Sequence, residues 1–555
     1  MQPAWREETG DSPGRGRWRQ HTWVPRDPWG LASVAWGLRS CGVGRLGDER
    51  RLTCPGAHLV ASLEMAAAAA HRPSWVPLLR LRPGGGGVGR GASGAAKTGR
   101  TCGTRGPGCL GSPSPGEGRL FRGWDGCGRR DAWHLQAHKY RRRSGGRRRA
   151  RAGGAPEDEP GSMTVTWTTW VPTPSEVQFG LQPSGPLPLR AQGTFSPFVD
   201  GGILRRKLYI HRVTLRGLLP GVQYVYRCGS AQGWSRRFRF RALKNGPHWS
   251  PRLAVYGDLG ADNPKALPRL RRDTQQGMYD AVLHVGDFAY NMDQDNARIG
   301  DKFMRLIEPV AASLPYMTCP GNHEERYNFS NYKARFNMPG DSEGLWYSWD
   351  LGPAHIISFS TEVYFFLHYG RHLVERQFHW LESDLQKANQ NRAARPWIIT
   401  MGHRPMYCSN ADLDDCTWHE SKVRKGLRGR FYGLEDLFYK YGVDLQLWAH
   451  EHSYERLWPI YNYQVFNGSQ EKPYTNPRGP VHIITGSAGC EERLTPFSLF
   501  PRPWSALRVK EYGYTRLHIL NGTHTHLQQV SDDQDGKIVD DIWVVRPLLG
   551  RMMYL

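Results

Sequence analysis

The stretch Ala281–Asn291, AVLHVGDFAYN, decides the fold that this sequence predicts. Its apolar run ends at Gly286, as expected of a short buried strand followed by a turn. Asp287 and Tyr290 follow that turn. In open α/β sheets, the residues at the carboxyl ends of the strands form the ligand-binding edge. A single aspartate there is more often a turn former or a helix cap, so the stretch gains meaning because similar strand ends recur downstream.

The chain has 555 residues and a formal net charge of +23, which is unevenly distributed. About 28 of the 74 Lys and Arg residues and about 10 of the 51 Asp and Glu residues precede Gly154. Residues 1–155 form this basic arm, which is rich in Gly, Arg and Pro and has no hydrophobic periodicity. We expect a disordered extension or a mistaken start, with nucleic-acid or acidic-membrane binding as the alternative. For the folded remainder no nucleic-acid partner is expected.

Cysteines and sequons favour an oxidising compartment. No CxxC pair occurs, so a structural zinc module is not expected. Cys408 and Cys416 are close enough in sequence to close a loop by a disulfide. Candidate glycosylation sites are Asn328, Asn467 and Asn521, although chance alone gives about two sequons in such a chain.

The sequence contains neither an evident membrane span nor a visible secretory signal. No run of about 18 apolar residues occurs, so no transmembrane helix is predicted. The first residues, MQPAWREETGDSPGRGR, lack the apolar core of a signal peptide.

Residues 158–245 predict a β-sandwich, which we expect to be fibronectin-III-like. Short alternating segments such as MTVTWTT, KLYIHRVTL and VQYVYRCG recur between turns. The alternation of basic residues and Phe over Arg236–Arg241 indicates one solvated and one buried face. The stretch KNGPHWSP then ends the module.

From residue 251 the pattern changes to alternating strands and helices, which predicts an α/β catalytic domain over 251–460. Strands are expected at LAVYGDLG, AVLHVGDFAYN, PYMTCPGNHE, PWIITMGHRP and VDLQLWAHEHSYER. Helices are expected after Pro268 as far as Met278, over 374–388, and around Leu434–Tyr441. Residues 478–546 are predicted to form further strands that complete the catalytic domain, with an Asp535–Gly536 turn before the last strand.

Five of these strand ends carry side chains that bind metals. The candidate donors are Asp258, Asp287, Tyr290, Asn322, His403, His450 and His452. Carboxylate, phenolate, carboxamide and imidazole suit iron, zinc or manganese. Seven donors exceed what one ion needs, so two ions with a bridging carboxylate are expected, about 3.5–4 Å apart.

The motifs GDLG, GDFAYN, GNHE, GHRP and AHEHSYER, in this order, resemble the motif set of the purple acid phosphatases, within the metallophosphoesterase superfamily. The resemblance covers about residues 158–550 and is nearest to the long iron/zinc purple acid phosphatase-like form. Tyr290 is its most specific residue, because other two-metal phosphoesterases lack a tyrosinate ligand there. The resemblance implies a β-sandwich ahead of a metallophosphoesterase α/β sandwich.

The resemblance also implies a role for each donor. A ferric ion is expected on Asp258, Tyr290 and His452, and Asp287 is expected to bridge. A divalent ion is expected on Asn322, His403 and His450, with Zn(II) favoured and Fe(II) or Mn(II) as alternatives.

The implied reaction is hydrolysis of phosphate monoesters at acidic pH by a metal-bound hydroxide. His323 is the expected catalytic residue, which would hydrogen-bond the phosphoryl group or give a proton to the leaving group. The sequence leaves open a phosphodiesterase or nucleotide pyrophosphatase on the same site, and a non-catalytic basic-arm binding protein. A homodimer is kept as a hypothesis, and the resemblance implies a secreted or lysosomal protein.

Two positions depart from the family pattern. Ala449 stands where the family has Gly, which is tolerable unless its φ is positive. The family often has a further histidine shortly after the one matched by His403, but Leu413 occupies that spacing. His419 is the nearest substitute, so the leaving-group acid is left open.

Overall fold

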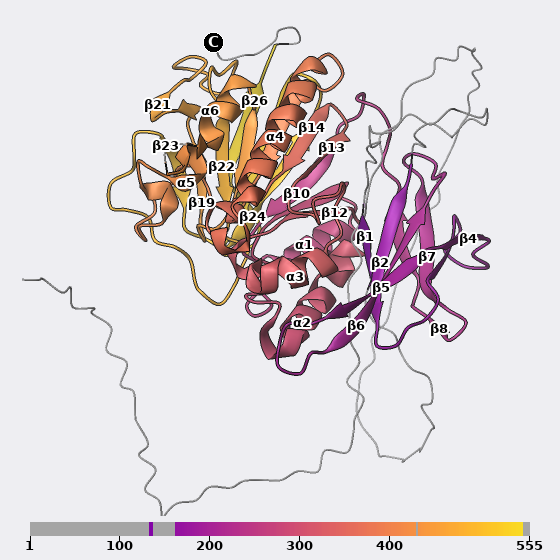
Figure 1. Ribbon diagram of the computed structural model, residues 1–555. Helices are drawn as coiled ribbons and strands as arrows, with labels where there is room; N and C mark the ends of the chain where they lie inside the picture. Colours follow the sequence, from indigo (N-terminus) through magenta and orange to yellow (C-terminus); the bar gives the residue numbers. More distant parts are fainter. Residues whose placement is uncertain (1–132, 137–160, 429–430, 548–555) are drawn as a thin grey trace, which may run out of the picture. The chain divides into compact units, whose positions relative to one another are not determined.

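The computed structural model describes residues 133–136, 161–428 and 431–547 (Figure 1). The expectation of a disordered arm over 1–155 falls on residues outside these ranges, except for β1 (Trp133–Gln136). This strand pairs antiparallel with β2 (Met163–Thr169), with Trp133 opposite Trp167. These four residues are the part of the arm that the structure describes, and the disorder expected for the rest of the arm stays a prediction. The edge of a β-sheet presents unpaired backbone groups, which another strand of almost any sequence can satisfy.

Two sheets make up the N-terminal β-rich region. One has the strand order β1-β2-β6-β5, and the other has β4-β3-β7-β8 with β9 also pairing to β7. The bounds are β3 Glu176–Gly180, β4 Leu189–Gln192, β5 Thr194–Val199, β6 Lys207–Leu215, β7 Gln223–Ser230, β8 Gly233–Trp234 and β9 Phe238–Arg241. Buried side chains of both sheets, among them Trp167, Phe179 and Phe240, form one cluster. The predicted β-sandwich is confirmed, while its fibronectin III topology stays a prediction.

The alternation expected at Arg236–Arg241 is found in β9. Its sequence FRFR has both Phe side chains buried and both Arg side chains exposed. Successive side chains of a strand point to opposite faces, so this pattern places one face in the core and the other in water.

Two larger sheets form the α/β region. The first has the order β12-β11-β10-β24-β25-β26, and the second has β13-β14-β15-β18-β22-β19-β23. The first is built from β10 Arg252–Tyr256, β11 Ala281–Val285, β12 Tyr316–Cys319, β24 Gly513–Ile519, β25 His524–Ser531 and β26 Lys537–Val545. The second is built from β13 Tyr347–Leu351, β14 Ala354–Ser358, β15 Trp397–Met401, β18 Leu445–Trp448, β19 Tyr454–Leu457, β22 Val481–Thr485 and β23 Ser505–Val509.

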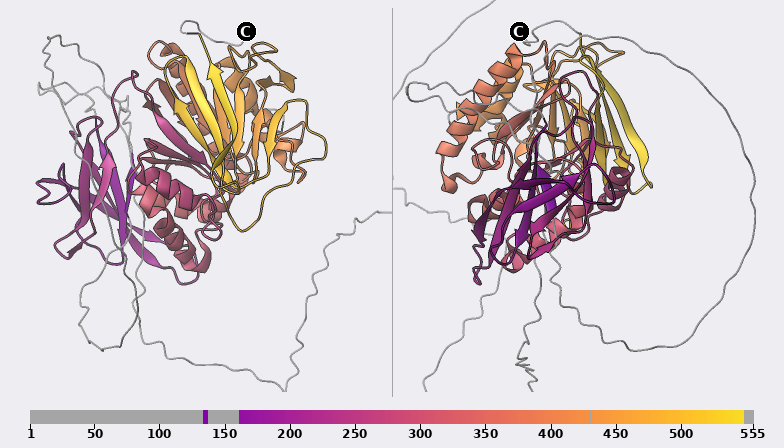
Figure 2. Two further views of the ribbon diagram at one scale, coloured as in Figure 1. Left: turned by 180° about the vertical axis from the view of Figure 1, so that it is seen from behind. Right: turned by 90° about the vertical axis from the view of Figure 1, so that its right-hand side faces the viewer.

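The closing segment continues the first sheet. β24 pairs antiparallel with β10, and β25 and β26 follow it as neighbouring strands, drawn in yellow in Figure 2. Asp535 (φ 50°) and Gly536 (φ 87°) form the turn before β26, as the sequence predicts. Positive φ at two successive turn residues is the reason for the Asp-Gly pair.

Helices lie between the strands. Their bounds are α1 Leu267–Gln275, α2 Gln294–Ala311, α3 Arg326–Arg335, α4 His372–Gln390, α5 Lys422–Lys425 and α6 Leu434–Lys440. Short 3-10 turns lie at η1 Asn322–Glu324, η2 Glu362–Tyr364, η3 Leu367–Tyr369 and η4 Asp415–Thr417. Two-residue ladders complete the fold at β16 Gly426–Leu427 with β17 Phe431–Tyr432, and β20 Ile460–Tyr461 with β21 Gln464–Val465.

The amphipathic helix expected over 374–388 is confirmed as α4, which buries Val374, Leu381 and Leu385. Within the described ranges, no helix is both long and apolar enough to span a membrane.

The hairpin of β13 and β14 was not expected from the sequence. Its second strand, AHIIS, is buried throughout and pairs parallel with β15, so it lacks the alternation by which half-buried strands are found.

Candidate metal centre

The carboxyl ends of five strands deliver all seven candidate donors to one place. Three of these strands, β10, β11 and β12, are parallel neighbours, and so are β15 and β18. Backbone hydrogen bonds join the loops that follow these strands. The Asp258 nitrogen donates to the Gly286 oxygen (3.3 Å), and the Ala449 nitrogen donates to the His403 oxygen (2.9 Å). Parallel strands end at the same edge of a sheet, so residues far apart in sequence meet there.

Four of the seven donors lie in the left-handed region of the backbone map. The φ angles are 57° for Asp258, 50° for Asp287, 49° for Tyr290 and 69° for His450. Non-glycine residues rarely adopt this conformation, and it concentrates at functional sites because surrounding structure must hold it. Ala449 is not among the described residues with positive φ, so its methyl group is tolerated as expected.

Glycines in the motifs allow the donors to approach closely. A Cβ at Gly286 would lie 2.4 Å from His403 Nδ1, and one at Gly321 would lie 2.2 Å from Asp287 Oδ1. No side chain fits at these distances, so the GD and GN pairs of the motifs are required by packing around the donors.

One group of donors surrounds the hydroxyl of Tyr290. That hydroxyl lies 3.1 Å from Asp258 Oδ1 and 2.8 Å from His452 Nε2. His452 Nε2 is also 3.5 Å from Asp258 Oδ1. Burial, together with the charges of Asp258 and Asp287, raises the pKa of Tyr290 well above its ordinary value. A phenol in this position therefore requires a cation to ionise.

A second group of donors surrounds Nε2 of His403. This nitrogen lies 3.1 Å from Asp287 Oδ2, 3.2 Å from Asn322 Oδ1 and 3.2 Å from His450 Nδ1. Asp287, His403 and His450 each offer a ligand atom within 4.8 Å of the other two. Burial alone would lower the pKa of His403, but the carboxylate of Asp287 raises it to about 10. The protonated ring thus supplies the positive charge that the buried carboxylates need, a role that a bound cation would take over.

Backbone carbonyls orient two of the histidines through Nδ1, the ring nitrogen that points away from the other donors. His403 Nδ1 donates to the oxygen of Val285 and His452 Nδ1 donates to that of Arg493, both at 2.9 Å. Each bond holds the proton on Nδ1, so Nε2 is the nitrogen directed at the other donors, and its lone pair becomes available when a cation displaces the second proton of the ring. The residues present therefore fit a two-metal centre.

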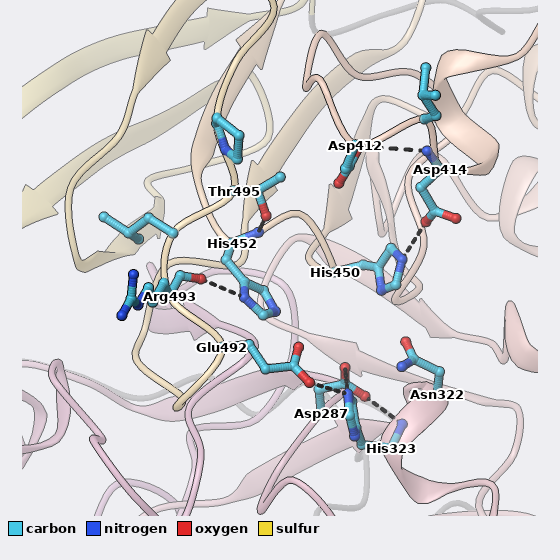
Figure 3. Close-up of a pocket in the computed structure, with 13 residues that line it drawn as sticks. Asp287, Asn322, His323, Asp412, Asp414, His450, His452, Glu492, Arg493 and Thr495 are labelled. Atoms are coloured by element: carbon cyan, nitrogen blue, oxygen red, sulfur yellow. Dashed lines mark hydrogen bonds and ion pairs between the residues drawn. The ribbon is translucent and has the colours of Figure 1, made fainter. Parts of the chain in front are cut away.

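An open pocket of about 410 Å³ lies over these donors (Figure 3). Its lining consists of Asp287, Asn322, His323, Asp412, Leu413, Asp414, His450, His452, Glu492, Arg493, Leu494, Thr495 and Pro496. The pocket gives a ligand access to the donors from solvent.

His323 faces this pocket without being one of the seven donors. Its Nδ1 donates to Asn291 Oδ1 at 2.9 Å, because that amide oxygen can only accept. Its Nε2 lies 3.5 Å from Glu492 Oε1 and 3.9 Å from Asp287 Oδ2. The ring is therefore fixed with one nitrogen toward the pocket.

Four carboxylates at the site, Glu324, Asp412, Asp414 and Glu492, were not assigned from the sequence. Buried Glu324 accepts from the backbone nitrogens of Asp287 (2.9 Å), Phe288 (3.0 Å) and Gly321 (2.9 Å), and so joins the two motif loops. Asp414 makes a short contact to His450 Nε2, and Glu492 faces His323. Only Glu324 had a sequence signal, as the last letter of GNHE.

Leu413 lines the pocket and is 69% exposed, whereas His419 does not line it. The ring of His419 instead stacks on Tyr463, with 5.0 Å between the ring centroids and 15° between the planes. His419, the nearest substitute for the histidine that this chain lacks at Leu413, is therefore not part of the pocket lining.

Cys408 and Cys416 are joined in a disulfide, which closes the loop that carries Leu413 and Asp414. Among the described residues, Cys228, Cys319 and Cys490 are buried thiols. Of the three sequon asparagines, Asn328 and Asn521 are exposed and Asn467 is half-buried.

A two-sheet α/β fold with this donor set at its strand ends defines a metallophosphoesterase. Residues 251–454 match the family model described as Calcineurin-like phosphoesterase. Residues 155–242 match the Purple acid Phosphatase N-terminal domain, and residues 479–541 match Iron/zinc purple acid phosphatase-like protein C.

Similar proteins indicate which family of metallophosphoesterases the chain belongs to. The chain is 93% identical over 397 residues to Acid phosphatase type 7 of Homo sapiens, covering 72% of this chain and 91% of that protein. It is 87% identical over 396 residues to the protein of the same name from Mus musculus, covering 71% and 90%. A solved purple acid phosphatase, PPD1 from yellow lupin seeds, shares the fold with a TM-score of 0.59 at 24% identity, covering 70% of this chain and 72% of that one. The chain belongs to the purple acid phosphatase family.

Proposed function

We infer that this chain is an acid phosphatase, which hydrolyses phosphate monoesters at a dinuclear metal centre. The observation that supports this most strongly is the convergence of seven donors from five strand ends, four of which (Asp287, Asn322, His450 and His452) line an open pocket. Two proteins named Acid phosphatase type 7 support the same conclusion, because the chain is 93% and 87% identical to them over 397 and 396 residues. Two cations in such a site bind the phosphate oxygens, acidify water and stabilise the leaving oxygen.

We propose that Asp258, Tyr290 and His452 hold the harder ion, Fe(III), with Asp287 as the bridge. Asn322, His403 and His450 would hold a divalent ion, with Zn(II) favoured over Fe(II) or Mn(II). Phenolate and carboxylate suit Fe(III), whereas two imidazoles and a neutral amide suit a divalent ion. The family model at residues 479–541 carries iron and zinc in its name, in agreement with this choice.

His323 is proposed to act on the substrate directly. Asn291 holds its Nδ1, so Nε2 is the atom directed at the pocket. From there, Nε2 can donate a hydrogen bond to the phosphoryl group or a proton to the leaving oxygen. Glu492 Oε1 lies 3.5 Å from this nitrogen, at the edge of the same pocket.

The cellular setting is part of the proposal. A buried disulfide and two exposed sequon asparagines support an oxidising route, with glycosylation and secretion or a lysosomal destination. Glycosidase treatment followed by a mass measurement tests the glycans, and light scattering tests the proposed homodimer.

Replacing Asp287 with Asn tests the function. The Asp287 carboxylate contacts His403 in one group of donors, and its charge acts on Tyr290 in the other, so D287N is expected to lose both ions and at least about 100-fold of p-nitrophenyl phosphate turnover. Elemental analysis and an activity assay measure the two effects. Asp541, whose Oδ1 lies 2.6 Å from His526 Nε2 in β25, offers the matched control. D541N also breaks an aspartate–histidine pair, and it should keep both bound ions and full activity. If D287N retained its metal ions and its turnover, the proposed function would be refuted.

A further inference from the structure

The ring of His450 is held differently from those of His403 and His452. Its Nδ1 lies 3.2 Å from His403 Nε2 and so faces the donors. Its Nε2 makes a short contact with Asp414 Oδ2. The same nitrogen lies 2.8 Å from Arg404 Nη1, which can only donate a hydrogen bond, whereas a carboxylate can only accept one. A cation bound at Nδ1 would occupy the lone pair of that nitrogen, so the proton would then be on Nε2, where Asp414 accepts it. The lone pair of Nδ1 is then directed at the donor group.

Asp414 is itself fixed by its surroundings. Arg404 Nη1 donates to Asp414 Oδ2 at 3.1 Å, and Arg404 Nε donates to Glu362 Oε2 at 3.1 Å. The side chain of Glu362 is fully buried, so this ion pair anchors the guanidinium. The backbone nitrogen and the hydroxyl of Thr417 donate to the carbonyl of Asp414 at 2.9 and 2.7 Å. These bonds hold Asp414 in place, with Oδ2 in contact with both Arg404 Nη1 and His450 Nε2.

The loop that carries Asp414 is the one that departs from the family pattern. It is closed by the Cys408–Cys416 disulfide and has Leu413 where a further histidine is often found. Backbone carbonyls orient His403 and His452, whereas a side chain orients His450. A side chain can be replaced, so the orientation of His450 can be tested separately from the donor itself.

We propose that Asp414 is a positioning residue of the metal centre, which keeps the proton on His450 Nε2 and so directs Nδ1 at the divalent ion. The inference rests on the proposed function, because it requires His450 to be a ligand. A carboxylate behind a ligand histidine fixes the tautomer and makes the ring a stronger donor, and its loss typically weakens metal binding 10- to 100-fold.

The test compares D414N with D412N by Zn(II) binding to the metal-free full-length chain, in competition with a chelator. Both variants remove one negative charge from the same loop and the same pocket. The amide of D414N can donate to His450 Nε2 and favour the wrong tautomer, whereas Asp412 accepts from the backbone nitrogen of Asp414 (3.5 Å). We expect D414N to bind one of its two Zn(II) ions about 10- to 100-fold more weakly, and D412N to change by less than about threefold.

A second measurement reports which nitrogen of the His450 ring carries the proton. Nitrogen NMR of histidine-labelled, metal-free protein should place the proton of His450 on Nε2 in the wild type and on Nδ1 in D414N. Circular dichroism checks that the variant is folded. If D414N does not fold, Asp414→Ser replaces it, because serine removes the carboxylate with a smaller side chain, and the same results are expected.

Each result decides the matter. Wild-type affinity in D414N would overturn the inference, and so would an equal loss in D412N, since charge rather than orientation would then explain it. A wild-type chain that binds no Zn(II) would overturn the proposed function and this inference together. Two wild-type ions with an unchanged D414N would overturn the inference alone.

Discussion

At the scale of single residues, Glu324 shows how one buried side chain organises two loops. Its Oε2 accepts from the backbone nitrogens of Asp287 and Gly321, and its Oε1 accepts from that of Phe288. Three backbone donors from two strand ends thus share one carboxylate. Buried backbone N–H groups are costly to leave unpaired, so Glu324 stabilises the left-handed turn at Asp287.

Replacing Glu324 with Gln should therefore destabilise the chain. An amide has only one acceptor oxygen, so at least one of the three N–H groups would face an NH₂ group and lose its partner. A loss of about 1–3 kcal/mol in unfolding free energy is expected, with weaker metal binding. Urea unfolding measures the change. The neighbour Glu325 accepts only a hydroxyl, from Tyr369 at 2.8 Å, among the contacts described, so E325Q should cost less than about 1 kcal/mol. Equal effects of the two variants would contradict this account.

At the scale of elements, the hairpin of β13 and β14 is joined to α4 by one buried histidine. Nδ1 of His355 in β14 lies 2.7 Å from Asp350 Oδ1 in β13, and its Nε2 lies 3.0 Å from Asp384 Oδ2 in α4. Burial alone would lower the pKa of His355, but the two carboxylates raise it to about 9. The three elements are therefore held together by a protonated ring between two acids.

This arrangement predicts a pH dependence of stability. The folded-state pKa of His355 lies above its ordinary value of 6.5, so its contribution is complete below about pH 6.5 and is lost as the pH rises through about 9. The wild type should exceed H355Q by roughly 2–3 kcal/mol near pH 6, and the difference should shrink between pH 7 and pH 10. Unfolding curves at several pH values measure it. A difference that does not vary with pH would show that the charge on His355 contributes nothing.

At the scale of the whole molecule, the donors tie together segments that span residues 258–452. Each donor lies at the end of a strand, and the strands belong to two sheets. Ions bound at this place bind the folded chain and not the unfolded one, so they should stabilise the whole α/β region.

Metal removal should therefore lower the unfolding temperature. At a free Zn(II) concentration 100-fold above the dissociation constant, one site adds about 2.7 kcal/mol of stability. Calorimetry of chelator-treated protein with and without added Zn(II) measures the shift, and D287N, which is expected to bind neither ion, should show none. A wild-type unfolding temperature that is insensitive to metal would contradict binding at the strand ends.

The sequence by itself determined the local features of this protein. KLYIHRVTL coincides with β6, the alternation in FRFR predicts the faces of β9, and the 374–388 periodicity predicts the buried side of α4. The motifs also named all seven donors that the structure brings together. These features could be predicted because each depends on residues close together in the chain, where periodicity and turn chemistry act directly.

Only the tertiary structure decided how the donors are oriented and what supports them. His403 is oriented by Val285, 118 residues away, and His450 is oriented by Asp414, 36 residues away. The tertiary structure also decides that Glu324 accepts hydrogen bonds from two loops, that His419 stacks on Tyr463 outside the pocket lining, and that β1 pairs with β2. Hydrogen bonds form between groups that are close in space, and a single sequence does not state which distant residues the fold will bring within 3 Å of one another.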